Sequence, residues 1–236
     1  MRAKAVLFDF DNTFYPYAPC NRAGKNAARE SARELGYDFG RKAFEAFYQT
    51  GRRAIKREVP GTAASHDRYL YFKRALERHT GRPKPTEALA LGEAYWRAYI
   101  DAMELVPDVE ATLESLRDRG IDVGVVTNFT ARTQLEKLEA VGLGDDLDLV
   151  VTSEETGREK PGSVMFTLAL SRLDRRPSEA VMVGDNVEAD IVGANAVGLE
   201  TVLFSADGDD PDGPLEGDRE PDHRIDSVAA LPEVVL

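Results

Sequence analysis

Residues 5–13 read AVLFDFDNT, and they decide the fold. The first four are apolar, as expected of a parallel strand that is buried on both faces. The chain then becomes polar at Asp9, and a second carboxylate follows at Asp11. Ligands of open parallel sheets bind beyond the carboxyl ends of the strands, so we expect residues 9–13 to lie at a functional edge.

Asp9 and Asp11 point to the same side of an extended chain, because side chains alternate along it. Two carboxylates about 4 Å apart repel each other by about 4 kcal/mol at an effective dielectric constant of about 20. A purely structural role offers nothing to offset that repulsion, whereas a bound cation does. The alternative is a turn with two solvated aspartates.

Further apolar runs of strand length follow downstream, at residues 121–127, 147–152, 180–183 and 200–204. Apolar residues at helical spacing precede or separate these runs, in the sets Val109/Leu113/Leu116, Leu135/Leu138/Val141, Met165/Leu168/Leu170/Leu173 and Ile191/Ala194/Val197. Strands that alternate with helices of this length indicate βαβ units with right-handed crossovers. The predicted fold is therefore α/β, with a three-layer, Rossmann-like parallel sheet as its core.

A long insert, residues 14–105, separates the first two predicted strands. A simple crossover needs only about a dozen residues. The insert has little strand character and shows helical periodicity over residues 27–35, 44–55, 69–76 and 89–100. We therefore expect a catalytic α/β core formed by residues 1–13 and 106–236, and an inserted α-helical cap domain formed by residues 14–105.

Carboxylates also follow the apolar run at residues 180–183. Asp185 comes directly after Gly184, and Asp190 lies about one helical turn further on. With Asp9, Asp185 would present carboxylate oxygens from two neighbouring strand ends. Carboxylates, a main-chain carbonyl and water are ligands that suit Mg²⁺. A Gly-Asp pair after a strand is as often a helix N-cap, so that alternative stays open.

Two further polar groups follow the strands at 121–127 and 147–152. Thr127 and Asn128 end the first of these runs, and Lys160 stands before Pro161 beyond the second. A hydroxyl and backbone N–H groups can hold phosphate oxygens, and a lysine supplies a point charge for them. Each signal is weak alone, but the clusters would all lie on one face of the sheet.

Composition limits the classes of function. The 236 residues carry a formal net charge of −12, which argues against sequence-independent nucleic-acid binding. Cys20 is the only cysteine, so no disulfide can form within the chain. No run approaches the ~20 apolar residues that span a bilayer. We expect a cytoplasmic protein with no membrane association; the oligomeric state and any high-salt role of the acidic segment 207–222 stay open.

The polar clusters together resemble those of the haloacid dehalogenase superfamily, specifically its phosphatase branch with a helical cap (C1-type) inserted just after the first motif. The matching residues are Asp9-Phe10-Asp11-Asn12-Thr13, Thr127, Lys160-Pro161, and Gly184-Asp185 with Asp190. The resemblance covers essentially the whole chain. It implies a Mg²⁺-dependent phosphomonoester hydrolase that acts on a small phosphorylated metabolite.

The resemblance also implies roles for these residues. Asp9 would attack phosphorus and form an aspartyl-phosphate, and Asp11 would act first as general acid and then as general base. Mg²⁺ would be bound by the carboxylates of Asp9 and Asp185 and by the main-chain carbonyl of Asp11.

Phosphoryl oxygens would be held by Thr127, the Asn128 N–H and Lys160. Asp190 would orient Lys160 or a metal-bound water, and direct binding of the metal stays open.

Other functions of the same fold remain in view. A dehalogenase would need neither Asp11 nor Asp185, a phosphomutase would share every core residue, and a non-catalytic binding protein would be expected to lack one of the clusters. The substrate is a small phosphate ester whose identity the sequence leaves open. Candidate specificity residues in the predicted cap are Tyr15, Tyr17, Arg52, Arg53, Lys56 and His66.

Overall fold

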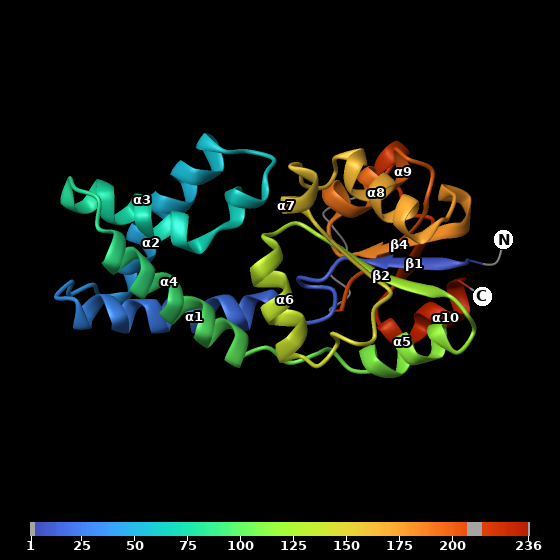
Figure 1. Ribbon diagram of the computed structural model, residues 1–236, viewed down its shortest axis with the longest axis horizontal. Coiled ribbons are helices and arrows are strands. Elements are labelled where there is room, and N and C mark those ends of the chain that lie inside the picture. The colour runs from blue at the N-terminus through green and yellow to red at the C-terminus, as the bar shows by residue number, and fades with distance from the viewer. Residues whose placement is uncertain (1–2, 207–213, 236) are drawn as a thin grey trace. The chain divides into compact units, whose positions relative to one another are not determined.

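The computed structural model describes residues 3–206 and 214–235 (Figure 1). Over these ranges a parallel sheet has the strand order β3-β2-β1-β4-β5-β6. The strands are β1 (Ala5–Phe8), β2 (Asp122–Thr127), β3 (Leu149–Thr152), β4 (Ala180–Gly184), β5 (Glu200–Phe204) and β6 (His223–Ile225). The predicted α/β fold with a parallel sheet is confirmed, and part of the acidic segment, residues 207–213, lies outside the described residues.

Helices cover both faces of this sheet (Figure 1). They are α5 (Val109–Arg117), α6 (Ala131–Ala140), α7 (Ser153–Thr156), α8 (Ser163–Leu173), α9 (Gly193–Asn195) and α10 (Leu231–Val235). Short turns complete the core, namely η2 (Pro177–Glu179), the π-helical η3 (Val187–Val192), η4 (Gly217–Arg219) and η5 (Val228–Ala230).

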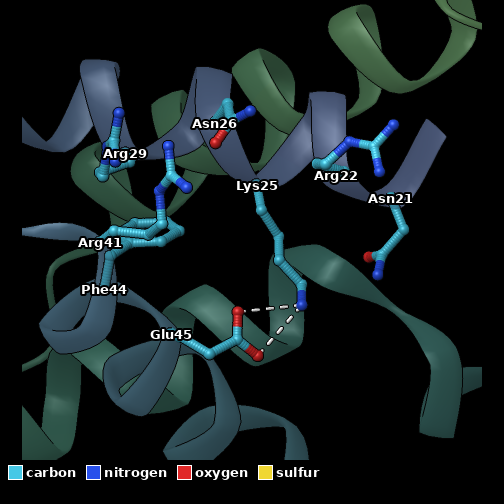
Figure 2. Close-up of a pocket in the computed structure, with 8 residues that line it drawn as sticks. All are labelled: Asn21, Arg22, Lys25, Asn26, Arg29, Arg41, Phe44 and Glu45. Atoms are coloured by element: carbon cyan, nitrogen blue, oxygen red, sulfur yellow. Dashed lines mark hydrogen bonds and ion pairs between the residues drawn. The ribbon is translucent and has the colours of Figure 1, made fainter. Parts of the chain in front are cut away.

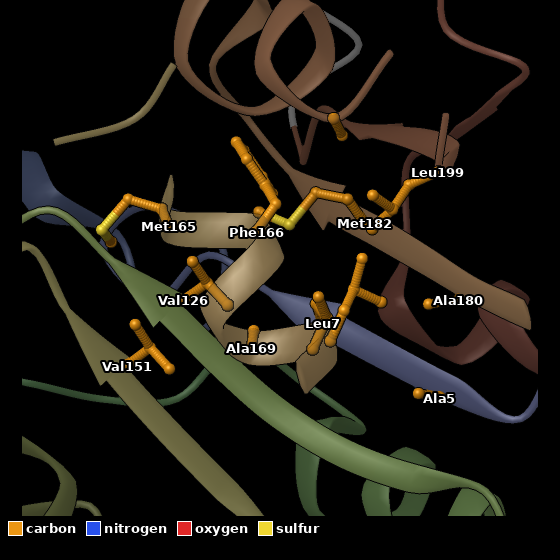
Figure 3. Packing of buried hydrophobic residues seen from close by; sticks show 12 residues of the cluster. Ala5, Leu7, Val126, Val151, Met165, Phe166, Ala169, Ala180, Met182 and Leu199 are labelled. Atoms are coloured by element: carbon orange, nitrogen blue, oxygen red, sulfur yellow. The ribbon is translucent and has the colours of Figure 1, made fainter. Parts of the chain in front are cut away.

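An apolar layer joins α8 to one face of the sheet. Met165 and Phe166 of α8 pack with Leu7, Val126 and other strand residues, as Figure 3 shows. These side chains are fully buried, and burying one large apolar side chain contributes about 1.5–3 kcal/mol. The layer therefore stabilises the packing of α8 against the sheet.

Strand register sets which loops meet at that edge. Phe8, the last residue of β1, pairs with Val125 of β2 on one side and with Val183 of β4 on the other. The residues that follow these three strands therefore leave the sheet side by side. As predicted, Asp9 and Asp185 follow neighbouring strands.

The chain divides into two compact units: one contains the chain up to Pro16 and from Glu104 onward, and the other is Tyr17–Met103. The second unit is helical, with α1 (Tyr17–Glu34), α2 (Arg41–Glu58), η1 (Ala63–His66), α3 (Arg68–Thr80) and α4 (Pro85–Asp101). Each helix is longer than the segment predicted for it. We call this unit the cap and the other the core.

Residues 14–16, which sequence analysis assigned to the cap, lie in the core unit. Phe14 packs against the rings of Phe8 and Phe10, with centroids 5.0 and 5.8 Å away, and its carbonyl accepts a hydrogen bond from the Val106 N–H. Because of this aromatic packing on β1, the first segment of the core ends at Pro16, three residues after the predicted boundary at residue 13.

Close helix packing within the cap gives a test of stability. A Cβ atom on Gly51 of α2 would lie 2.0 Å from the carbonyl oxygen of Tyr71 in α3. We expect Gly51→Ala to force the two helices apart and to lower the free energy of unfolding by about 1–3 kcal/mol in urea titrations. Gly40→Ala, at the start of the same helix with nothing within 4 Å, should cost only about 0.5 kcal/mol. Equal losses in the two variants would contradict this packing.

No helix in the described part of the chain is long and apolar enough to cross a bilayer.

Candidate active site

Asp9 and Asp11 belong to a tight turn that follows β1. The Asp9 N–H donates to the Val183 carbonyl at 2.8 Å, which continues the pairing of β1 with β4. The Phe14 N–H then donates back to the Phe10 carbonyl at 3.0 Å, and Asn12 adopts a left-handed conformation with φ of 69°. This turn brings Tyr15 beside Asp11, where the two residues form an isolated bridge.

Asp9 is paired with a buried lysine. The Lys160 Nζ lies 2.7 Å from Asp9 Oδ1 and 2.7 Å from Asp190 Oδ1, and the Lys160 side chain is 1% exposed. Burial favours the neutral amine, but the two carboxylates outweigh it and raise the pKa of Lys160. Burial also raises the pKa of Asp9; Lys160 opposes that rise, and the neighbouring carboxylates add to it.

Asp185 completes a group of three carboxylates. Asp9, Asp185 and Asp190 each present an oxygen within 4.8 Å of the others. The Asn12 Nδ2 donates to Asp185 Oδ2 at 2.7 Å, but burial, the largest effect, raises the pKa of Asp185 to about 6. Three carboxylates around one lysine leave an excess of negative charge, and hard oxygen donors are the ligands that Mg²⁺ prefers. The residues present therefore fit a divalent cation.

Gly184 makes room for Asp190 in this group. A Cβ atom at position 184 would lie 2.2 Å from Asp190 Oδ2, so a larger residue would displace the carboxylate. The same oxygen accepts a hydrogen bond from the Asn186 N–H at 3.0 Å. Asp190 lies in η3, is 1% exposed and forms an ion pair with Lys160.

Asn128 ties the end of β2 to the loop that carries Lys160. Its side-chain Oδ1 accepts from the Lys160 N–H at 2.7 Å, and its Nδ2 donates to the Lys160 carbonyl at 3.1 Å. The side chain thus orients the lysine backbone, a role that sequence analysis did not assign. Thr127, one residue earlier, is fully buried, and its Oγ1 accepts a hydrogen bond from Gln134.

Asp11 is held by a separate set of residues. Its Oδ1 accepts from the Tyr15 hydroxyl and from Lys137 Nζ at 2.5 Å, and its Oδ2 accepts from Gln134 Nε2 at 2.9 Å. Burial would raise the pKa of Asp11, but the charge of Lys137 and the three donors outweigh it and lower the pKa to about 2. Asp9 and Asp11 therefore each have their own buried lysine, and these two lysines offset part of the repulsion that sequence analysis expected a bound cation to offset.

Helix α6 buries only part of the predicted apolar stripe, since Leu138 is 2% exposed. The Leu135/Leu138/Val141 pattern placed Leu135 toward the core, yet Leu135 is 56% exposed. Gln134 and Lys137 are buried instead, at 0% and 1%. The only signal in the sequence was their spacing of three, which places two long polar side chains on one helix face.

The candidate specificity residues are divided between the units. Tyr15 lies in the core against Asp11, not in the cap. Within the cap, the Tyr17 hydroxyl accepts from Arg68 at 2.8 Å, and Lys56 lies 3.1 Å from a ring nitrogen of His66. Arg52 and Arg53 are exposed.

Residues of α1 and α2 in the cap line an open pocket of about 240 Å³ (Figure 2). Glu45 is its only acidic lining residue and is paired with Lys25 at 3.0 Å. The other lining residues are basic, polar or aromatic: Asn21, Arg22, Asn26, Arg29, Arg41 and Phe44. The pocket lining is therefore basic, whereas the chain as a whole has a net charge of −12.

Comparison with known proteins gives the family. A model of the haloacid dehalogenase-like hydrolases matches residues 3–198. The chain is 61% identical over 237 residues to a protein of Halopiger xanaduensis named ribulose-1,5-bisphosphate 5-phosphatase, and 99% of each chain is covered. It is 34% identical to a glyceraldehyde 3-phosphate phosphatase of Methanopyrus kandleri, with 98% of this chain and 97% of the relative covered.

A solved structure is also similar, that of a 2-haloacid dehalogenase from Pseudomonas syringae pv. Tomato DC3000. Its TM-score is 0.78 at 28% identity, with 99% of this chain and 98% of the other covered. The chain belongs to the haloacid dehalogenase-like hydrolases, as the resemblance indicated. It is a phosphatase of small phosphorylated metabolites.

Proposed function

We propose that the chain is a Mg²⁺-dependent phosphomonoesterase that works through an aspartyl-phosphate on Asp9. The observation that carries the proposal is the separate environment of the two carboxylates after β1. Asp9 lies among the carboxylates and Lys160, where a phosphoryl group and a cation would meet. The Asp11 side chain is not part of that group, and it accepts hydrogen bonds from Lys137 and Gln134 instead.

In the first half-reaction, an Asp9 oxygen forms a bond to phosphorus as the bond to the ester oxygen breaks. Asp11 gives the departing oxygen the proton that it took from water in the second half-reaction of the preceding turnover. Lys160, the Thr127 hydroxyl and the Asn128 N–H hold the phosphoryl oxygens as charge shifts onto them.

In the second half-reaction, a water oxygen forms a bond to phosphorus, the Asp9–phosphorus bond breaks, and Asp11 takes the water proton. Mg²⁺ would be held by the carboxylates of Asp9 and Asp185 and the main-chain carbonyl of Asp11, and when bound it would screen the repulsion between these carboxylates and the phosphoryl group. Asp190 would keep Lys160 oriented.

The substrate class that we propose is a sugar bisphosphate, because the relative with 61% identity over 99% of its length is named for one. A triose phosphate is the second candidate, since the relative at 34% identity is named for glyceraldehyde 3-phosphate. Dehalogenation is less well supported: that chemistry requires neither a general acid at position 11 nor a metal ligand at position 185, and both carboxylates are present.

A substrate panel tests this proposal. We expect the highest kcat/KM for ribulose 1,5-bisphosphate when phosphate release is measured with Mg²⁺, followed by glyceraldehyde 3-phosphate and then 4-nitrophenyl phosphate. A 2-chloro acid should release no chloride. Halide release without phosphate release would contradict the proposed function, and a preference for the triose phosphate would replace only the substrate class.

A further inference from the structure

The basic pocket of the cap has no role in the proposed reaction. Four of its lining residues are cations and one is an acid, namely Arg22, Lys25 and Arg29 of α1 and Arg41 and Glu45 of α2 (Figure 2). In the whole chain, by contrast, acidic residues outnumber basic ones by 42 to 30. Pockets for drug-sized molecules measure about 300–1,000 Å³, so a volume of about 240 Å³ suits a smaller ligand.

Only part of this positive charge is balanced within the cap. Lys25 reaches across the pocket, and its Nζ lies 3.0 Å from a carboxylate oxygen of Glu45 (Figure 2). Arg29 lies 3.4 Å from the carboxylate of the next residue. The side chains of Arg22 and Arg41 are exposed and make no ion pair or hydrogen bond with any described residue. Two guanidinium groups of the pocket therefore have no carboxylate partner in the described structure.

The positions of these cations are unfavourable for the helices that carry them. Arg22, Lys25 and Arg29 follow one another at spacings of four or less, so like charges lie side by side on one face of α1, which weakens a helix. Arg41 begins α2, where the helix dipole favours a carboxylate and not a cation. The first turn of α2 has no acidic residue, and Gly40 before it makes no side-chain cap hydrogen bond. A bound anion would offset the repulsion in both helices.

We propose that this pocket binds the phosphate group of a small molecule through Arg22 and Arg41. A guanidinium group presents two parallel N–H donors that match the oxygens of a phosphate. A phosphate monoester carries nearly two negative charges at neutral pH, which balances two arginines.

Such a ligand would also join two helices that share little packing, because α1 packs mainly against α4 and α2 against α3. The inference does not rest on the proposed function. Every residue that lines the pocket belongs to the cap, and every residue proposed for catalysis belongs to the core.

Titration calorimetry of the full chain tests the inference, with inorganic phosphate and glycerol 2-phosphate as probes. EDTA and one fixed KCl concentration are used throughout, so that no metal–phosphate complex forms at the core. Because two charge-assisted donors are lost, the double variant Arg22→Gln with Arg41→Gln should raise the dissociation constant at least about tenfold. Tighter binding of the ester would identify the ligand as a phosphorylated metabolite, and equal binding would identify it as free phosphate.

Arg57→Gln with Arg78→Gln is the matched control. It makes the same change of charge at two exposed positions of the cap that do not line the pocket, so its dissociation constant should stay within about twofold of the wild-type value. Both double variants replace exposed residues and should unfold at the wild-type urea concentration.

Hydrogen exchange locates the bound phosphate. Either probe should slow amide exchange in residues 21–29 and 41–45 of the wild type and of the control, but not of the Arg22/Arg41 variant. Equal dissociation constants in the two double variants would overturn the inference, since they would place phosphate elsewhere on the chain. Absence of binding at millimolar phosphate, or of protection in these two segments, would also overturn it.

Discussion

Asp9→Asn should abolish both turnover and the phosphoenzyme. The amide is a poor nucleophile, and the proposed reaction has no other route to the covalent intermediate, so we expect kcat for 4-nitrophenyl phosphate to fall by on the order of 10⁴-fold or more. Asparagine has the size of aspartate, and Lys160 keeps its 2.7 Å contact with Asp190, so the fold should persist. Phosphate release and acid-quench trapping measure the two effects.

The control for this variant is Asp118→Asn, which makes the same change at an exposed position at the end of α5. It should retain wild-type activity. Residual phosphoenzyme in Asp9→Asn would show that another residue is the nucleophile, and Asp11 would then be the first to examine.

Removal of divalent cations should likewise abolish activity. Asp9, Asp185 and Asp190 each present a carboxylate oxygen within 4.8 Å of the others, and Lys160 forms ion pairs with Asp9 and Asp190. A phosphate dianion would add to the repulsion among the carboxylates. We expect no phosphate release in EDTA and full recovery when Mg²⁺ is added in excess.

Binding can be measured without turnover. A ligand present at 100 times its dissociation constant stabilises the folded state by about 2.7 kcal/mol, so Mg²⁺ should raise the melting temperature of the wild type. Asp185→Asn should lose most of that shift. Full activity in EDTA, together with no effect of Mg²⁺ on melting, would exclude the metal assignment and favour the dehalogenase alternative.

The positions of β1 to β5 were predictable because each contains a short apolar run, and four of these runs are followed by a polar cluster; β6, which reads His-Arg-Ile, has no such run. β1 was predicted at its observed bounds. The positions of Asp9, Thr127 and Asp185 at the carboxyl ends of strands could be predicted from the parallel sheet alone. Lys160 and Asp190 are in contact, and the orienting role of Asp190 stays a prediction.

The partners of Asp11 were not predictable from local patterns. Leucine periodicity in residues 131–140 identifies Leu138 as buried but misplaces Leu135 and misses Lys137, because an isolated helix would not bury a lysine. The lysine is buried only because Asp11, 126 positions earlier in the chain, supplies a countercharge at 2.5 Å. Tyr15 was assigned to the cap for a related reason, since aromatic contacts with β1 and its turn are visible only in the folded chain.

The central claim is that the reaction passes through a phosphoryl group on Asp9, and peptide mass spectrometry after acid quench tests it most directly. Asp11→Asn lacks the base of the second half-reaction, so this variant should accumulate the intermediate when it is mixed with an aryl phosphate and Mg²⁺. The account predicts one phosphoryl group on the peptide that contains residues 5–13, assigned to Asp9 by fragmentation. Turnover in this variant with no covalent phosphate, or with phosphate on any other residue, would contradict it.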